Sequence, residues 1–117
     1  MLAIVLLNEQ HKLLPEQKEL LDSKFPKYKV KSIPAEGWTR EEMETITDEL
    51  VGRTVVFVSP IPLLIRELSV ISGAEMQGDF KNKEFTKVFL FHNDKREKKE
   101  INGKIISVIS KTGWELV

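Results

Sequence analysis

The sequence predicts one α/β domain, in which helices cover both faces of a mainly parallel sheet and an antiparallel hairpin follows near the carboxyl terminus. Short apolar runs, such as Leu2–Leu7 and Thr54–Val58, alternate along the chain with segments that have helix-starting and helix-ending residues. This alternation is typical of parallel strands joined by right-handed crossovers, with helices on both sides. The dipeptide Asn102-Gly103 then predicts a two-residue hairpin turn.

The first strand is the apolar run Leu2–Leu7, whose lack of alternation indicates burial on both faces of the sheet. A helix begins at Pro15, because proline suits the first helical turn, and it ends before Pro26. Apolar and polar residues alternate over Tyr28–Ile33, so we expect a half-buried strand near an edge of the sheet.

The second helix follows Thr39, since Thr39 and Glu42 have the spacing of a capping box, and Gly52 ends it. Thr54–Val58 is then the third strand, apolar throughout and therefore buried.

A third helix is predicted over Leu63–Ile71, with Ser59 as its cap, Pro60 at its first position and Gly73 at its end. This segment is apolar on most sides, so we expect it to be largely buried. Residues 74–85 have no clear period and are predicted to form a loop.

The last part of the chain is predicted to consist of strands. Lys87–Phe91 is a further apolar strand, Arg96–Ile101 and Lys104–Ile109 form the hairpin, and Trp114–Val117 is a terminal strand.

Composition excludes several classes of function. The 117 residues suit one domain, and 18 basic side chains balance 18 acidic ones, so the chain lacks the field with which proteins bind long nucleic acids nonspecifically. The absence of cysteine excludes disulfides, iron–sulfur clusters and cysteine nucleophiles. No segment is apolar for long enough to span a membrane, and no basic region precedes the apolar start, so we expect a cytoplasmic protein.

Charge is unevenly distributed despite this balance. Residues 36–49 contain one arginine and six acidic residues, whereas residues 81–104 contain eight basic and four acidic side chains. A modest basic patch is therefore expected around the fourth strand.

Three polar clusters follow the buried strands: Asn8–His11, Ser59–Pro62 and His92–Arg96. Ligands of open parallel sheets bind outside the carboxyl ends of the strands. If the three strands are neighbours, the clusters converge on one ligand site, and both histidines of the chain belong to it.

Known phosphate and metal motifs are absent from these clusters. No glycine-rich dinucleotide fingerprint follows the first strand, and the chain has no P-loop sequence. Glu9, His11, His92 and Asp94 have no spacing that indicates a metal site, so none is predicted.

The cluster residues also have purely structural interpretations. Ser59 can be a helix cap at a rigid helix start, or it can donate a hydrogen bond in a ligand pocket beside the Ile61 amide. His92 can be a solvated strand end, or it can bind phosphate and carry a proton together with Arg96. The run Arg96–Glu100 is more simply the charged face of an edge strand. Trp38 and Trp114 are more simply packing residues than base-stacking platforms.

The opening of the chain resembles a known protein family. Asn8 and His11, followed by Pro15-Glu16-Gln17, resemble the start of small stand-alone CRISPR-associated proteins with a Rossmann-like CARF domain. Ser59-Pro60-Ile61-Pro62 after an apolar strand is also similar, whereas Leu14 replaces the threonine that this family places before its Pro-Glu-Gln. The similarity covers the first and third strand–helix units.

This resemblance implies one CARF-like domain over residues 1–117, in a homodimer that binds a cyclic oligoadenylate second messenger, the tetra-adenylate above all, and opens it as a ring nuclease. The implied reaction needs no metal or other cofactor, because a ribose 2′-OH attacks the neighbouring phosphorus and leaves a 2′,3′-cyclic phosphate. Asn8, His11 and Ser59 match the family's turns. Strand-end position and charge alone add the others, so the candidate catalytic residues are His11, His92 and Arg96 and the candidate ligand-binding residues are Asn8, Gln10, Ser59, Ile61, Asn93 and Lys95.

Two other functions remain open from the sequence. The same site could sense or sequester a cyclic nucleotide without cutting it. Alternatively, the chain could be an assembly subunit that binds no nucleotide and uses its apolar helix and its hairpin for contacts with partners.

Overall fold

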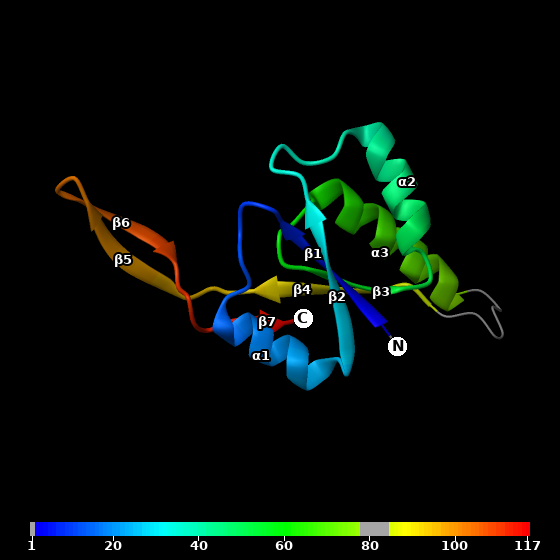
Figure 1. Ribbon diagram of the computed structural model, residues 1–117, viewed down its shortest axis with the longest axis horizontal. Helices are drawn as coiled ribbons and strands as arrows, with labels where there is room; N and C mark the ends of the chain where they lie inside the picture. The colour runs from blue at the N-terminus through cyan, green and yellow to red at the C-terminus, as the bar shows by residue number, and fades with distance from the viewer. Residues whose placement is uncertain (1, 78–84) are drawn as a thin grey trace.

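The computed structural model, which describes residues 2–77 and 85–117, confirms the predicted α/β fold class (Figure 1). A mostly parallel sheet of the Rossmann-like kind has helices on both faces, and an antiparallel hairpin projects from it. The elements are β1 (Leu2–Asn8), α1 (Pro15–Lys24), β2 (Lys27–Ile33), α2 (Arg40–Leu50), β3 (Thr54–Phe57), α3 (Pro62–Gln77), β4 (Lys87–His92), β5 (Arg96–Ile101), β6 (Lys104–Ile109) and β7 (Glu115–Leu116).

The main sheet has the strand order β2-β1-β3-β4-β7. Its first four strands are parallel, and β7 pairs antiparallel with β4. β2 lies at an edge, as its alternating pattern predicts, and the short β7 closes the other edge. Strand order reverses between β1 and β3, so the carboxyl ends of these two strands form the switch point at which such sheets bind ligands.

Two apolar cores lie on opposite faces of the sheet. Val55 and Phe57 of β3 point towards α2 and α3, where Leu64 and Leu68 are fully buried. Val56 points to the other face and packs in the core that contains Leu21 of α1. This alternation along one buried strand explains why β3 has an apolar run instead of a period of two.

Local capping fixes where α1 and α2 begin. The predicted box at α2 is confirmed, because the Glu42 N–H donates to Thr39 Oγ1 at 3.1 Å. At α1, the buried Gln17 side chain reaches back and its Oε1 accepts the Leu14 N–H at 3.0 Å. This contact satisfies an amide at the helix start although Leu14 has no capping hydroxyl.

The predicted start of α3 is wrong. The helix begins at Pro62, and the Ser59 hydroxyl does not cap it but accepts the Asn8 N–H at 2.9 Å. A residue that precedes proline is forced towards extended backbone, so neither Ser59 nor Ile61 can take a helical conformation before Pro60 and Pro62. The segment therefore forms an extended turn beside the end of β1.

The predicted end of α3 is also wrong. The helix continues through Gly73 to Gln77, because one glycine inside a helix costs only about 1 kcal/mol and good helix formers follow it. The first residues of the predicted loop 74–85 are thus helical, and residues 78–84 lie outside the described residues. Val70 is 65% exposed, so this helix is less buried than its composition predicts.

The hairpin β5-β6 forms as predicted and projects away from the main sheet (Figure 1). Its turn residues Asn102 and Gly103 have φ values of 52° and 76°, as a two-residue hairpin turn requires. The projection gives the molecule extents of 58 × 33 × 23 Å. No helix in the described part of the chain is long and apolar enough to cross a membrane.

Candidate functional site

The strand order brings the three polar clusters to one edge of the sheet, because β1, β3 and β4 are direct neighbours. The Asn8 N–H donates to Ser59 Oγ at 2.9 Å, so the clusters after β1 and β3 are in contact. Phe57 pairs with Leu90 in the register of β3 and β4, which places His92 at the same end of the sheet.

A groove of about 520 Å³ opens at this edge on the side covered by α1. Its walls come from the loop after β1, the turn after β3 and the segment that returns from the hairpin towards β7. The polar and aromatic groups with which a ligand could interact include Asn8, His11, Lys12, Ser59, Lys111 and Trp114. The lining contains two lysines and a histidine but no aspartate or glutamate.

The loop that presents His11 and Lys12 is held by the side chain of Asn8. Asn8 Oδ1 accepts the Gln10 N–H at 2.9 Å, and the Asn8 carbonyl accepts the His11 N–H at 2.9 Å. The Glu9 carboxylate accepts the Ala35 N–H at 2.9 Å and ties the loop to the segment after β2. Asn8 thus shapes the groove through a tight side-chain turn, and the exposed His11 side chain projects from it.

Ser59 has a different relation to the groove. Its oxygen accepts the Asn8 N–H, so its own O–H can still donate to a ligand. The extended turn imposed by Pro60 and Pro62 keeps this hydroxyl at the edge of the sheet.

The side chain of Asn93 organises the base of the hairpin. It is 8% exposed, and its Nδ2 donates to the carbonyls of Ser110 at 3.0 Å and Thr112 at 2.9 Å. Its Oδ1 accepts the Lys95 N–H at 2.8 Å. The Arg96 guanidinium donates to the Asn93 carbonyl at 2.9 Å. Asn93 and Arg96 therefore stabilise the hairpin base by contacts within the chain.

The carboxyl-terminal segment reaches the groove because Glu16 of α1 binds its backbone. Glu16 Oε1 accepts the N–H groups of Gly113 at 2.9 Å and Trp114 at 2.7 Å. The Trp114 ring packs edge-on against Phe91, with centroids 6.3 Å apart. Its Nε1 is buried and has no hydrogen-bond partner among the described residues.

The structure brings some of the predicted site residues together and leaves others apart. Asn8, His11 and Ser59 line the groove. Gln10 is exposed next to the groove, and Ile61 packs against the core under α2 and α3.

The candidates after β4 do not line this groove. His92 alternates with Phe91 along the strand, so it lies on the same face as Leu90, opposite the face of α1. Lys95 donates from its Nζ to Thr112 Oγ1 at 3.2 Å, and it belongs to the hairpin base with Asn93 and Arg96.

Sequence reasoning missed Lys12 and Lys111, which the groove contains, and it favoured a packing role for Trp114, which also lines the groove. Lys12 follows His11 directly, so the basic character of that loop was a usable signal. Nothing local indicates that residues 111–114 return to α1, since the contacts that hold them there join residues 97 and 98 positions apart.

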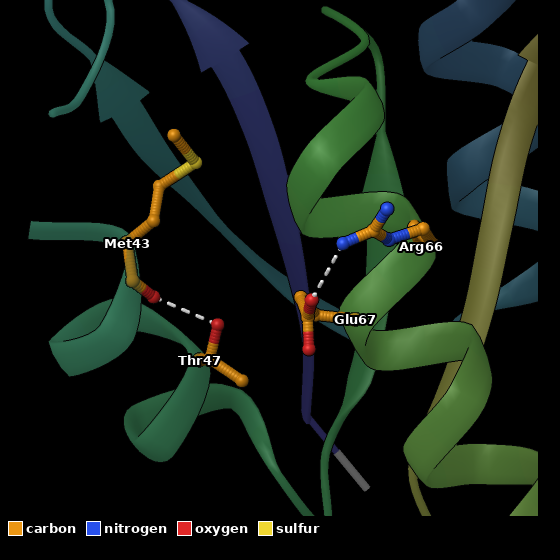
Figure 2. Close-up of polar contacts among 4 residues, drawn as sticks. All are labelled: Met43, Thr47, Arg66 and Glu67. Carbon is orange, nitrogen blue, oxygen red and sulfur yellow. Dashed lines mark hydrogen bonds and ion pairs between the residues drawn. The ribbon is translucent and has the colours of Figure 1, made fainter. Parts of the chain in front are cut away.

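A second groove of about 390 Å³ lies between α2 and α3 and has the opposite charge. Its lining includes Glu44, Asp48 and Glu67 but a single cation, Arg40. Figure 2 shows the Thr47 hydroxyl of α2, which donates to the Met43 carbonyl at 2.7 Å, and Glu67 of α3, whose carboxylate is 3.3 Å from the Arg66 guanidinium. Three carboxylates disfavour a phosphate-bearing ligand here.

A third groove follows the outer edge of β2. Lys29, Lys31 and Arg53 make it basic, and Lys31 pairs with Glu49 at 3.9 Å. It includes no histidine and no aromatic side chain, and it lies away from the carboxyl ends of β1 and β3.

Among the described residues, no three histidine, aspartate or glutamate side chains are arranged so that they could hold a metal ion. Comparison with known proteins gives no match for this chain among family models, curated proteins or solved structures.

Proposed function

We propose that this protein binds a cyclic oligoadenylate in the groove at the carboxyl ends of β1 and β3 and opens the ring by transesterification. The groove's charge is the observation that carries the proposal: its lining has two lysines and a histidine and no carboxylate. The resemblance of the first and third strand–helix units to CARF-like ring nucleases supplies the class of ligand.

The groove offers recognition for both parts of an adenylate. Lys12 and Lys111, which two separate segments of the chain contribute to the lining, can pair with phosphates. Trp114 belongs to the same lining, and its ring can stack on adenine. A neutral chain whose cations gather in small local grooves suits a small anionic ring better than a long polyanion.

The proposed reaction needs positioning and proton transfer. The ribose 2′-oxygen forms a bond to the neighbouring phosphorus, the bond from phosphorus to the 5′-oxygen breaks, and a 2′,3′-cyclic phosphate remains. The proton leaves the 2′-OH, and the departing 5′-oxygen gains one. Holding the 2′-oxygen in line with the leaving oxygen supplies much of the rate, and the lysines stabilise the charge of the phosphorane.

His11 is the residue in the groove best suited to move the proton. An imidazole is the side chain whose ordinary pKa lies nearest neutrality, so it can accept the 2′-OH proton and return one to the 5′-oxygen. The Asn8 turn fixes the backbone of His11 and leaves its ring exposed at the groove.

Binding without cleavage is the second candidate function. The groove's lining contains one imidazole, that of His11, whereas acid–base catalysis of transesterification gains from two groups that transfer protons. A sensor or sequestering protein would need only the cations, the Ser59 hydroxyl and Trp114.

Incubation with radiolabelled cyclic tetra-adenylate in EDTA tests both functions. The ring nuclease produces linear products with a 2′,3′-cyclic phosphate, and the first product keeps the mass of the ring because no water is added. His11→Ala is expected to reduce cleavage at least 100-fold, the order of a general acid–base contribution, and to change affinity by less than about threefold. Lys12→Ala and Lys111→Ala each weaken binding, whereas Lys18→Ala on the exposed side of α1 is the matched control.

The outcomes separate the candidates. Retention of the intact ring without cleavage supports the sensor. If the protein neither retains nor cleaves cyclic tetra-adenylate or cyclic hexa-adenylate, the nucleotide proposal is contradicted. Loss of turnover in His92→Ala or Arg96→Ala, with His11→Ala unaffected, moves the reaction to the end of β4. Loss of binding in Lys29→Ala, with Lys111→Ala unaffected, moves the ligand to the groove beside β2.

A further inference from the structure

Of the two strands of the projecting hairpin, β6 has an unusual pattern for an exposed edge. Every residue of β5 is exposed and five of its six are charged, as expected for a solvated edge strand. β6 instead carries Ile105, Ile106, Val108 and Ile109, which point alternately to both faces of the hairpin. Ile105 is 72% exposed and Ile109 is 54% exposed. A strand that is apolar on both faces is typical of the interior of a sheet.

The other exposed edges of the described sheets are protected. β2 carries Lys27, Lys29 and Lys31 along the free edge of the main sheet, and β7 contains two residues only. Charges and short length are the usual devices that prevent edge-to-edge pairing. Within β6, Lys104 at its start is the single charge, so this edge is open to pairing with another strand.

The free backbone groups of β6 can be identified from the hairpin register. Ile101 pairs with Lys104 across the two-residue turn, and the Ser110 N–H donates to the Lys95 carbonyl at 3.1 Å. Even-numbered residues of β6 therefore direct their backbone groups towards β5. The odd-numbered residues Ile105, Ser107 and Ile109 direct theirs outward, where another strand can pair.

The sequence of β6 is complementary to a second copy of itself. Ser107 is the centre of a near-palindrome, with two apolar residues on each side, Ile105-Ile106 and Val108-Ile109. In an antiparallel pair centred on Ser107, Ile105 lies opposite Ile109 of the other copy and Ile106 lies opposite Val108. Each apolar side chain thus meets an apolar side chain on the same face.

The charges at the ends of this pairing are also complementary. The same register places Lys104 opposite Ser110 of the second copy. Ser110 Oγ donates to the Glu97 carboxylate at 2.7 Å, so that carboxylate lies beside the position Lys104 would reach. Two-fold symmetry repeats the contact, which gives two lysine–glutamate pairs that favour this register over a slipped one.

We propose that two copies of this chain associate through β6, in antiparallel pairing centred on Ser107, to form a four-stranded sheet in the order β5-β6-β6-β5. The charged β5 strands become the outer edges, and the exposed isoleucines of β6 are buried between the copies. Ile109, Ser110 and Lys111 also line the groove at the carboxyl ends of β1 and β3, so this pairing brings the two grooves to the dimer interface. The association does not depend on any ligand.

Substitution by proline at matched positions tests the pairing without nucleotide. Ser107→Pro removes an outward N–H from β6, and Lys98→Pro makes the same change on the outer edge of β5, directly opposite in the hairpin register. Sedimentation equilibrium is expected to give twice 13.5 kDa for the wild type and for Lys98→Pro, and 13.5 kDa for Ser107→Pro. Circular dichroism and the NMR spectrum of the main sheet check that both variants fold.

A wild-type monomer at NMR concentrations, a dimeric Ser107→Pro or a monomeric Lys98→Pro would each overturn the proposal. If Ser107→Pro does not fold, hydrogen exchange in the wild type tests the pairing in its place. The amides of Ile105, Ser107 and Ile109 are expected to be protected increasingly with protein concentration, while that of Lys98 is not. Equal exchange at all four would contradict β6 pairing. A negative result leaves the nucleotide proposal standing, because the groove lies within one chain.

Discussion

Two asparagines at strand ends act on the protein's own backbone. Asn8 closes the loop after β1 by accepting the Gln10 N–H, and Asn93 holds the hairpin base by donating to two carbonyls. Both were candidate ligand-binding residues, because a polar side chain at the end of a buried strand suits a site. Their amides shape the loops, and in the loop after β1 His11 and Lys12 are the more exposed residues.

The single tyrosine of the chain offers a direct test of the contacts around α1. The Tyr28 hydroxyl donates to Asp22 Oδ1 at 2.8 Å, and burial, this hydrogen bond and the Asp22 charge raise the pKa of the phenol above 10.0. Tyrosinate absorbance is expected to appear above that value. Asp22→Asn is expected to lower the pKa, since it removes the charge.

The sign for stability follows from the raised pKa of Tyr28. Folding favours the protonated phenol of Tyr28. Its contribution to the free energy of unfolding is therefore complete below the pKa of the unfolded chain, near 10, and is lost as pH rises through the higher pKa of the folded protein. Denaturant titrations at alkaline pH measure it. A tyrosinate transition in Asp22→Asn at the same pH as in the wild type would contradict the assigned contact.

At the scale of elements, the segment between β6 and β7 needs glycine at one position. Gly113 has a φ of +85°, and a Cβ there would lie 3.2 Å from two carbons of Lys95. Its N–H also donates to Glu16. Gly113 therefore combines a left-handed backbone, a close approach to the hairpin base and a hydrogen bond to α1. Together these three features determine where the next residue, Trp114, lies.

Gly113→Ala and Gly37→Ala form a matched pair. Gly37 also has a left-handed φ, of +79°, but nothing lies within 4 Å of a Cβ at that position. We expect Gly37→Ala to lower the free energy of unfolding by about 1–2 kcal/mol, the cost of left-handed backbone for alanine. Gly113→Ala should lose a further ~1–3 kcal/mol, because Lys95 must move. Urea denaturation measures both, and equal losses would mean that the crowding has no energetic effect.

Sequence patterns predicted the elements well wherever one local rule acted alone. The buried strands followed from apolar runs, and Asn102-Gly103 located the hairpin turn. α3 failed at both ends, since two prolines delayed its start to Pro62 and Gly73 did not end it. At the start, the preference of proline for the first helical turn competed with its restriction of the preceding residue. At the end, the tendency of glycine to terminate a helix competed with the helix formers that follow it. The sequence pattern alone could not rank these effects.

The site was predictable at the scale of the whole molecule only in part. Parallel strands bring their carboxyl ends together, so the meeting of Asn8 and Ser59 followed from the fold class. The position of the wall that contains Lys111 and Trp114 did not follow from it, because that wall depends on two hydrogen bonds that Glu16 accepts from residues almost a whole chain away. Such contacts leave no trace in local periodicity.

The distribution of charge over the surface also becomes visible only in the folded molecule. The balanced total conceals an acidic groove between α2 and α3 and a groove with lysines and no carboxylates beside α1. Under the proposed function, this separation favours the groove at the carboxyl ends of β1 and β3 over the acidic groove as the site of an anionic ligand.

The indole N–H resonances of the two tryptophans test that claim most directly. Trp114 lines the groove with an unpartnered Nε1, whereas Trp38 packs against the core under α2 and α3. During titration with cyclic tetra-adenylate in EDTA, the Trp114 resonance is expected to shift in a saturable way while that of Trp38 stays in place. A stationary Trp114 resonance under conditions where the ring binds would contradict the groove as its site.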